Sequence, residues 1–187
     1  MDYKQAVDKL SHTLSPKRFS HSLGVSRTAA ELAARFGENI EKARLAGLLH
    51  DCARGIPSNN LLQMAESFDI VMNDVERCQP VLLHAPLGAC LAQKEYGVDD
   101  PHILRAIALH TTGGRDMSTL DKIIYVADFI EPGRDFPRAD KLRSLALQDL
   151  DAGLLACFDQ SIHYVIDQNL LIHPATIEGR NYLLLQK

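Results

Sequence analysis

The sequence predicts an all-helical protein. Apolar residues recur at helical spacing along almost all of the chain, whereas alternating runs of β-branched residues, which are typical of strands, are missing. Proline and glycine residues divide this pattern into segments of helix length. The chain has 187 residues, of which 46% are hydrophobic, which is enough for one sizeable core but short for two. We therefore expect a single domain over residues 1–187.

Start and stop residues delimit the helices in the first half of the chain. Pro16 follows a short first helix, and a long helix then runs from about Lys17 to Phe36, where a glycine ends it. The next helix begins near Asn39 and is apolar on several faces near its end, so His50 and Asp51 should lie deep in the protein. Three further segments are a helix from an N-cap at Ser58 through Phe68, a short segment at about Asp74 to Cys78, and an element that starts at Pro80.

The second half of the chain places chemically interesting residues at the ends of helices. His84 opens a helix, and His110 closes another before a Thr-Thr-Gly-Gly turn. Asp128 lies near the end of the strongly apolar stretch LDKIIYVADFI. The predicted helices run from His84 to Gly97, from Pro101 to about His110, from Leu120 to Ile130, from about Ala139, from about Leu150, and over a short tail after Pro174.

Composition excludes several classes of protein. The net charge of −4 offers no general attraction for nucleic acid or anionic lipid. No apolar stretch approaches the roughly 20 residues of a membrane helix, and the start MDYKQAVDKL lacks a signal-peptide pattern, so we expect a cytoplasmic protein. The cysteines are expected to be reduced because they are far apart and form no CxxC pair: Cys52, Cys78, Cys90 and Cys157.

Several histidines and two aspartates predict a metal site. A carboxylate within an apolar helix is costly unless a cation, hydrogen bonds or a metal compensates it, and this applies to both Asp51 and Asp128. Imidazole and carboxylate ligands suit iron, manganese, cobalt or zinc. Six ligands are too many for one tetrahedral ion but fit two ions about 3.5 to 4 Å apart. The predicted ligands are His21, His50, Asp51, His84, His110 and Asp128.

Asp51 is the natural bridge between two ions. Adjacent residues on a helix project about 100° apart, so His50 and Asp51 can border one cavity while His50 serves one ion only. Metal coordination lowers the pKa of water from about 15.7 towards about 7. The sequence therefore predicts that a hydroxide between the ions hydrolyses a phosphoryl group, with Asp51 as a catalytic residue.

Basic residues beside the predicted ligands are candidate phosphate clamps, because arginine pairs with phosphate oxygens through two hydrogen bonds. Arg54, one turn beyond Asp51, is placed with the catalytic residues as well. The turn after His110 offers backbone N–H groups to an anion. The predicted substrate-binding residues are Lys17, Arg18, Arg54, Thr111, Gly113, Arg115 and Arg134.

Plainer interpretations remain open for single residues. Each arginine is also compatible with a solvated surface charge, and Asp128 alone with a helix cap or an ion pair to Arg134. A lone buried histidine is more often a hydrogen-bonded core residue than a ligand. The whole ordered set favours the metal site. Four histidines fall outside the pattern and are expected to be structural or exposed: His12, His102, His163 and His173.

The order His21, His50-Asp51, Asp128 resembles the HD superfamily of helical metal phosphohydrolases. Five further motifs make the chain similar to the YqeK family over nearly its whole length: RFSHSLGV, LAGLLHDCARGIP, LLHAPLGA, ALHTTG and DKIIYVADFIEPGR. This resemblance implies an HD-type helical bundle, a dinuclear centre of iron or a similar metal, divalent or mixed-valence, and symmetrical hydrolysis of diadenosine tetraphosphate to two ADP. Arg54 departs from the lysine that the family commonly carries there, so a phosphate clamp is implied but a role for a lysine amine is not.

Two other functions remain open. One is a different HD phosphohydrolase activity, on nucleotides or cyclic dinucleotides. The other is a nucleotide-binding signalling module without hydrolysis, which the complete ligand set disfavours. In each case the partner is a small phosphorylated molecule, and a homodimer is a reasonable expectation for a small enzyme.

Overall fold

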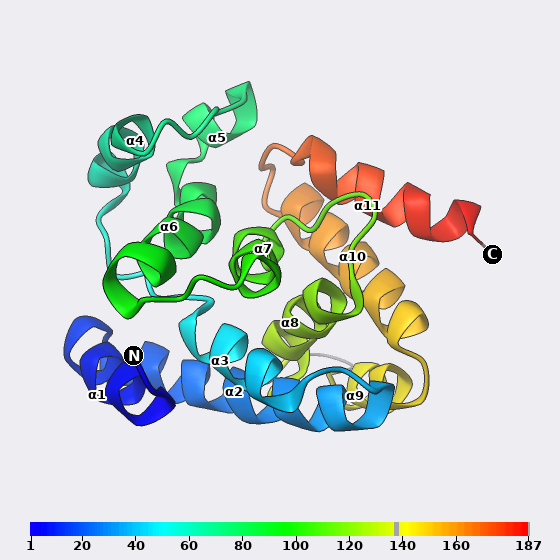
Figure 1. The fold of residues 1–187 in the computed structure, drawn as a ribbon. Coiled ribbons are helices and arrows are strands. Elements are labelled where there is room, and N and C mark those ends of the chain that lie inside the picture. The colour runs from blue at the N-terminus through cyan, green and yellow to red at the C-terminus, as the bar shows by residue number, and fades with distance from the viewer. Residues whose placement is uncertain (137–138, 187) are drawn as a thin grey trace.

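The computed structural model describes residues 1–136 and 139–186 and is all-helical in these residues, with eleven α-helices, one 3-10 helix and no strand (Figure 1). The helices are α1 (Tyr3–Thr13), α2 (Pro16–Phe36), α3 (Ile40–Leu49), α4 (Ser58–Ser67), α5 (Asp74–Cys78), η1 (Pro80–Leu83), α6 (His84–Tyr96), α7 (Pro101–Leu109), α8 (Thr119–Ile130), α9 (Ala139–Gln148), α10 (Leu150–Asp167) and α11 (Pro174–Leu185). The prediction of an all-helical fold is confirmed.

Helices α2, α3, α7 and α8 form the centre of the bundle. Helix α2 packs against α3 and α8, and α7 contacts both α3 and α8. Among their fully buried side chains are Leu32, Leu48, Ile107, Ile123 and Tyr125. The chain's two ends cover this centre from different sides, with α1 beside α2 and α11 beside α10 (Figure 1). The core therefore surrounds the helix ends that carry the predicted metal ligands.

Capping residues explain most helix boundaries. The Ser15 side chain accepts a hydrogen bond from the Arg18 N–H at the start of α2, and Gly37 ends this helix in the left-handed conformation. Ser118 and Asp121 form a capping box at the start of α8. Ser58 is not the N-cap of α4 as predicted. Pro57 occupies that position in an extended conformation that proline adopts readily, and it makes no capping hydrogen bond because its side chain has no acceptor.

The end of α3 also differs from the prediction. The helix ends at Leu49, His50 is its C-cap, and Asp51 lies in the following turn instead of on the helix. The turn is closed by backbone hydrogen bonds from Cys52 N–H to the Leu49 carbonyl and from Arg54 N–H to the Asp51 carbonyl. The two neighbouring side chains therefore border one site because the chain turns there.

Two further observations concern the chain as a whole. The four cysteines are free, as predicted, and none of them forms a disulfide in the described residues. None of the described helices combines the length and the apolar character that crossing a membrane requires.

Candidate metal centre

The six predicted ligands converge from five helices. His21 comes from α2, His50 and Asp51 from the end of α3, His84 from the start of α6, His110 from the end of α7, and Asp128 from α8. Four of these residues are at most 5% exposed, although each carries a polar side chain. Such burial of polar groups requires compensation at close range.

The two carboxylate oxygens of Asp51 face different pairs of histidines. Its Oδ2 atom lies 4.0 Å from the Nε2 atom of His21 and 3.7 Å from that of His50. Its Oδ1 atom lies 3.3 Å from the Nε2 atom of His84 and 3.7 Å from that of His110. Asp51 therefore stands between two sets of ligands, which is the arrangement expected of a bridging carboxylate.

Asp128 completes the set that contains His21. Its Oδ1 atom lies 2.9 Å from His21 Nε2 and 3.8 Å from His50 Nε2. Within the described residues, three groups have ligand atoms within 4.8 Å of one another: His21, His50 and Asp51; His50, His110 and Asp128; and Asp51, His84 and His110. The shared members connect these groups into one cluster large enough for more than one ion.

Every ligand histidine has its Nδ1 atom engaged by an acceptor. The Nδ1 atoms of His50, His84 and His110 each donate to the backbone carbonyl three residues earlier, those of Gly47, Val81 and Ile107 respectively. The Nδ1 atom of His21 donates to the carboxylate of Glu131 at 3.1 Å. A proton on Nδ1 leaves the Nε2 lone pair free, and all four Nε2 atoms point into the cluster.

The residues present fit divalent metal ions. The Nε2 atoms of His84 and His110 lie 3.1 Å apart. Since both carry lone pairs, a hydrogen donor or a cation is needed between them, and the Thr111 hydroxyl, which lies within hydrogen-bond distance of both, can donate to only one at a time. In the part of the chain that the structure describes, the buried Nε2 atom of His50 has no hydrogen-bond partner, and that of His21 faces the Asp128 carboxylate 2.9 Å away. Imidazole nitrogens beside two carboxylates are the donor set that iron, manganese, cobalt or zinc takes.

Electrostatics hold His50, Asp51 and Asp128 in their binding forms, whereas at His21 the carboxylates of Asp128 and Glu131 outweigh burial and raise the pKa of the imidazole. Burial lowers the pKa of His50 to about 4 despite the nearby Asp51, so its imidazole is neutral. Burial alone would raise the pKa of Asp51, but the neighbouring His50, His110 and His84 outweigh it and hold this pKa well below its ordinary value. Asp128 is likewise ionised, because His21, His50 and Arg134 outweigh the effect of burial on its pKa.

Glu131 belongs to this site although the sequence did not predict it. Its side chain is buried, accepts from His21 Nδ1, and accepts from the backbone N–H of Gly133 at 2.7 Å. A Cβ atom at Gly24 would collide with the Glu131 carboxylate, so only glycine leaves room for it on α2. Glu131 therefore orients the His21 ring towards the cluster. The signal that could have revealed it is a carboxylate directly after an apolar helix, one turn beyond Asp128.

Glu131→Gln is expected to weaken metal binding about 10- to 100-fold, the usual cost of losing a partner behind a ligand histidine. The amide keeps the shape but replaces the negative charge that faces His21. Titration of the metal-free protein with Mn²⁺ or Fe²⁺ measures the affinity. Glu178→Gln, at an exposed position on α11, is the matched control. Equal affinities of the Glu131 variant and the unmodified protein would show that Glu131 does not support His21.

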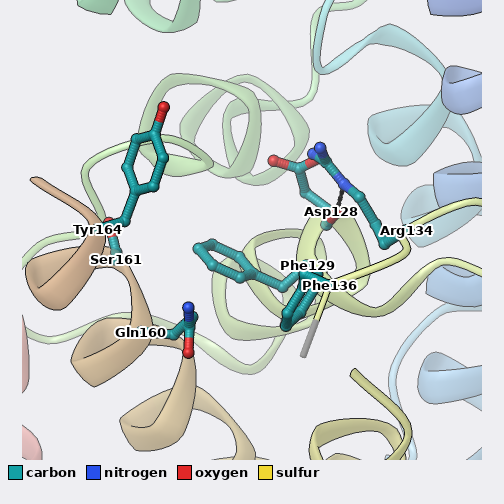
Figure 2. Close-up of a pocket in the computed structure, with 7 residues that line it drawn as sticks. All are labelled: Asp128, Phe129, Arg134, Phe136, Gln160, Ser161 and Tyr164. Atoms are coloured by element: carbon teal, nitrogen blue, oxygen red, sulfur yellow. Dashed lines mark hydrogen bonds and ion pairs between the residues drawn. The ribbon is translucent and has the colours of Figure 1, made fainter. Parts of the chain in front are cut away.

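Two predicted phosphate clamps reach the cluster itself. The Arg18 Nη1 atom lies 2.8 Å from Asp51 Oδ2, and Arg134 pairs with the Asp128 carboxylate, as Figure 2 shows for the latter pair. The Nε atom of Arg134 also donates to the backbone carbonyl of Asp128 at 2.7 Å. The side chains of both residues are more than one third exposed. They therefore border the ligands on one side and solvent on the other.

These two arginines line a cavity beside the cluster. The cavity has a volume of about 500 Å³, and Lys17, Arg18, His21, Glu131 and Arg134 are among its lining residues. We call it the basic cavity. Its opening brings three cations next to the ligand His21, which suits a chain of phosphate groups.

Arg54 lies half-buried near the same end of the cluster. Burial lowers the pKa of its guanidinium, and the charge of Arg18 lowers it further, while Asp51 and Asp128 act in the opposite direction. Two guanidinium groups close enough to affect each other create a site that favours an anion.

The predicted substrate-binding residues after His110 make different contacts. The Thr111 hydroxyl lies 3.1 Å from His84 Nε2 and 3.0 Å from His110 Nε2, inside the cluster. The Gly113 N–H donates to the Leu109 carbonyl at 2.8 Å, so it is not available to an anion as predicted. Arg115 is exposed and stacks on the ring of Tyr182 in α11, 5.0 Å from its centroid. Among the described contacts, none joins Arg115 to the metal ligands.

The histidines excluded from the site lie elsewhere, as expected. His12, His102 and His163 are exposed on α1, α7 and α10. His173 is the N-cap of α11, where its Nδ1 atom accepts from the Ala175 N–H. In the described residues, none of these four joins a group of possible metal ligands.

The fold and the cluster together define a class, that of the HD-type metal-dependent phosphohydrolases. Residues 18–133 match the family model described as HD domain, and the chain belongs to that family, within its YqeK-like branch. It is 38% identical over 184 residues to the symmetrical bis(5'-nucleosyl)-tetraphosphatase of Bacillus subtilis (strain 168), with 98% of each chain covered. It is 35% identical over 187 residues to the enzyme of that name from Halalkalibacterium halodurans, with 100% of each chain covered.

A solved structure agrees with this assignment. The crystal structure of a predicted HD superfamily hydrolase involved in NAD metabolism from Clostridium acetobutylicum superposes with a TM-score of 0.97. The two proteins are 45% identical, and the match covers 100% of this chain and 99% of the other. The similarity therefore extends well beyond the metal ligands.

Proposed function

We propose that this protein is a symmetrical bis(5'-nucleosyl)-tetraphosphatase that hydrolyses diadenosine tetraphosphate to two ADP. The observation that carries the proposal is the complete histidine and aspartate cluster beside the basic cavity. Relatives of this name are 32 to 38% identical over nearly the full chain, which supports the choice of substrate. A degenerate binding module would be expected to have lost one or more of the ligands.

Six residues would hold two metal ions, for which we propose iron, with manganese, cobalt and zinc as alternatives. His21, His50 and Asp128 surround one end of the Asp51 carboxylate, and His84 and His110 the other end. When bound, such ions supply Lewis acidity towards phosphoryl oxygens and lower the pKa of water. The protein contributes imidazoles, ionised carboxylates and ring orientations fixed by Nδ1 hydrogen bonds.

The basic residues would bind the polyphosphate. Lys17 and Arg18 line the basic cavity, and Arg134 borders the cluster at Asp128. We propose that phosphate oxygens take over the exposed faces of Arg18 and Arg134, so that charge developing on the leaving ADP is stabilised. Arg54 adds positive charge from the half-buried side, and the Thr111 hydroxyl orients groups between His84 and His110.

The assembly is part of the same proposal. We infer that residues 1–187 act as one domain and that two chains form a homodimer, since twofold symmetry is the commonest arrangement of small oligomeric enzymes. Size-exclusion chromatography with light scattering measures this directly. A mass of one chain at micromolar concentration would contradict the dimer without affecting the proposed reaction.

The position of bond cleavage tests the function. Attack of water at an inner phosphorus of diadenosine tetraphosphate breaks the central anhydride and gives two ADP. In oxygen-18 water, one labelled oxygen is expected in the terminal phosphate of only one of the two ADP molecules per turnover. Mass spectrometry of the products reads both the cleavage site and the label.

Other products would change the conclusion in defined ways. ATP with AMP as the main products would refute symmetrical cleavage but leave a phosphohydrolase. Faster turnover of a cyclic dinucleotide would favour a different HD activity. No turnover of any phosphorylated substrate with iron, manganese or cobalt supplied would favour a binding module.

A further inference from the structure

A second cavity borders the metal cluster on the other side of Arg134. It has a volume of about 430 Å³ and is lined by Phe129, Phe136, Gln160 and Tyr164, together with Asp128 and Arg134 of the cluster. We call it the aromatic cavity. Figure 2 shows Gln160 and Tyr164, both from α10, on one side of it and Phe129 and Phe136 on the other, with the Tyr164 ring rising above the level of the phenylalanine rings. Its volume is in the range of cavities that take small ligands.

The lining of this cavity is suited to a flat heterocycle. Phenylalanine and tyrosine rings offer stacking surfaces, and stacking on them is tolerant of the base because every base has a π-face. Phe129 is held in place by stacking on the buried Tyr125, with ring centroids 5.5 Å apart. The side chain of Gln160 points towards the cavity (Figure 2), and an amide can pair with adenine by accepting a hydrogen bond from its N6 amino group and donating one to its N7 atom.

The aromatic and basic cavities meet at the cluster. Arg134 lines both of them. His21 lines the basic cavity and Asp128 the aromatic cavity, and these two side chains are 2.9 Å apart. A molecule that fills both cavities therefore passes directly over the metal ligands. Its two halves meet different surroundings, one formed by rings and the other by cations.

We propose that the aromatic cavity holds one nucleobase of the substrate, stacked against Tyr164 and the phenylalanine rings and read by Gln160. This inference rests on the proposed function, which supplies a substrate with two identical nucleosides. The polyphosphate extends from the base past Arg134 towards Lys17 and Arg18. Recognition of the two identical halves is therefore unequal, with one base held by stacking and the other half held through its phosphates.

The test compares ligands with and without a base. Isothermal titration of the metal-loaded full chain measures the Kd of ADP and of inorganic pyrophosphate. Tyr164→Ala and Gln160→Leu change residues on the outer wall, and Tyr164 is 58% exposed, so its truncation removes little packing. Tyr164→Ala is expected to weaken ADP binding about 5- to 100-fold, the range for loss of one stacking side chain, and to leave pyrophosphate binding within about twofold.

Ile166→Ala is the matched control, because Ile166 is on the same helix and 54% exposed but does not line the cavity. It should change neither Kd. Equal weakening of ADP and pyrophosphate by Tyr164→Ala, no weakening of ADP, or wild-type affinities that do not differ between the two ligands would overturn the base site. Gln160→Leu should lower the preference for ADP over UDP, and an unchanged preference would remove Gln160 from the proposal.

The outcome is separable from that of the proposed function. A wild-type protein that leaves diadenosine tetraphosphate intact but binds ADP through Tyr164 retains the base site and loses the tetraphosphatase assignment. A protein that cleaves the substrate symmetrically with the same KM in the Tyr164→Ala variant retains the assignment and loses the base site.

Discussion

Asp51→Asn is expected to abolish turnover of diadenosine tetraphosphate while the helical fold survives. Each oxygen of this carboxylate faces a different pair of histidines, and the amide removes the negative charge while keeping the shape. Loss of a bridging ligand should cost several kcal/mol of transition-state stabilisation, so activity should fall by about a thousandfold or more. Steady-state kinetics measure the loss, and circular dichroism checks the helix content.

His12→Ala is the control for this experiment. His12 is exposed on α1, outside the cluster, and its replacement should leave kcat/KM nearly unchanged. Activity of the Asp51 variant within about tenfold of the unmodified protein would contradict a bridging role, because losing an essential ligand should reduce transition-state stabilisation by more than that.

His84→Ala and Arg134→Ala are expected to separate ligands from phosphate clamps. The Nε2 atom of His84 points at Asp51 and His110, so its removal should lower the amount of bound metal. Arg134 pairs with Asp128, but Asp128 keeps His21 as a neighbour, so metal content should be preserved. The kcat/KM value of the Arg134 variant should fall by about 1.5 to 3 kcal/mol, the value of a charge-assisted hydrogen bond.

Metal analysis of anaerobically purified variants is the measurement. Equal loss of metal from both would show that Arg134 supports the ligands instead of the substrate. A chelator should stop the reaction of the unmodified protein, and returned metal should restore it, since the ion supplies chemistry that no side chain of the cluster replaces.

Many helix boundaries could be predicted from residues close by in the sequence. Pro16, Gly37, Gly97 and Pro101 delimit helices as predicted, because a fixed φ at the start and a left-handed residue at the end act within one turn of the chain. Ser58 was predicted wrongly as an N-cap for the same local reason. Serine favours that position, but the adjacent proline already provides the required conformation.

The site was predictable where residue chemistry decided the outcome. A buried His50-Asp51 pair and a buried Asp128 need a cation, whatever the exact packing, and the structure brings these residues together. Positions of longer side chains depend on tertiary contacts. Arg115 stacks on Tyr182, which lies 67 residues away in the chain and could not be paired with it by sequence spacing.

Glu131 and the aromatic cavity were missed for related reasons. Glu131 follows a helix at a position where exposed acids are common, and its burial depends on the space that Gly24 leaves on α2. The cavity combines residues from α8, the segment after it and α10. Sequence periodicity predicts the buried face of each helix, but not the gap that remains when two helices pack at an angle.

The hydrogen bonds behind the ligand histidines determine how freely the surrounding sequence can vary. At His50, His84 and His110 the acceptor is a backbone carbonyl, which substitution at that residue does not remove. Mutational drift at Val81 or Ile107 therefore leaves the ring orientation intact as long as the local backbone persists. His21 is different, because its acceptor is the side chain of Glu131. In a saturation mutagenesis library we expect Glu131 to tolerate few replacements, while Val81 accepts many.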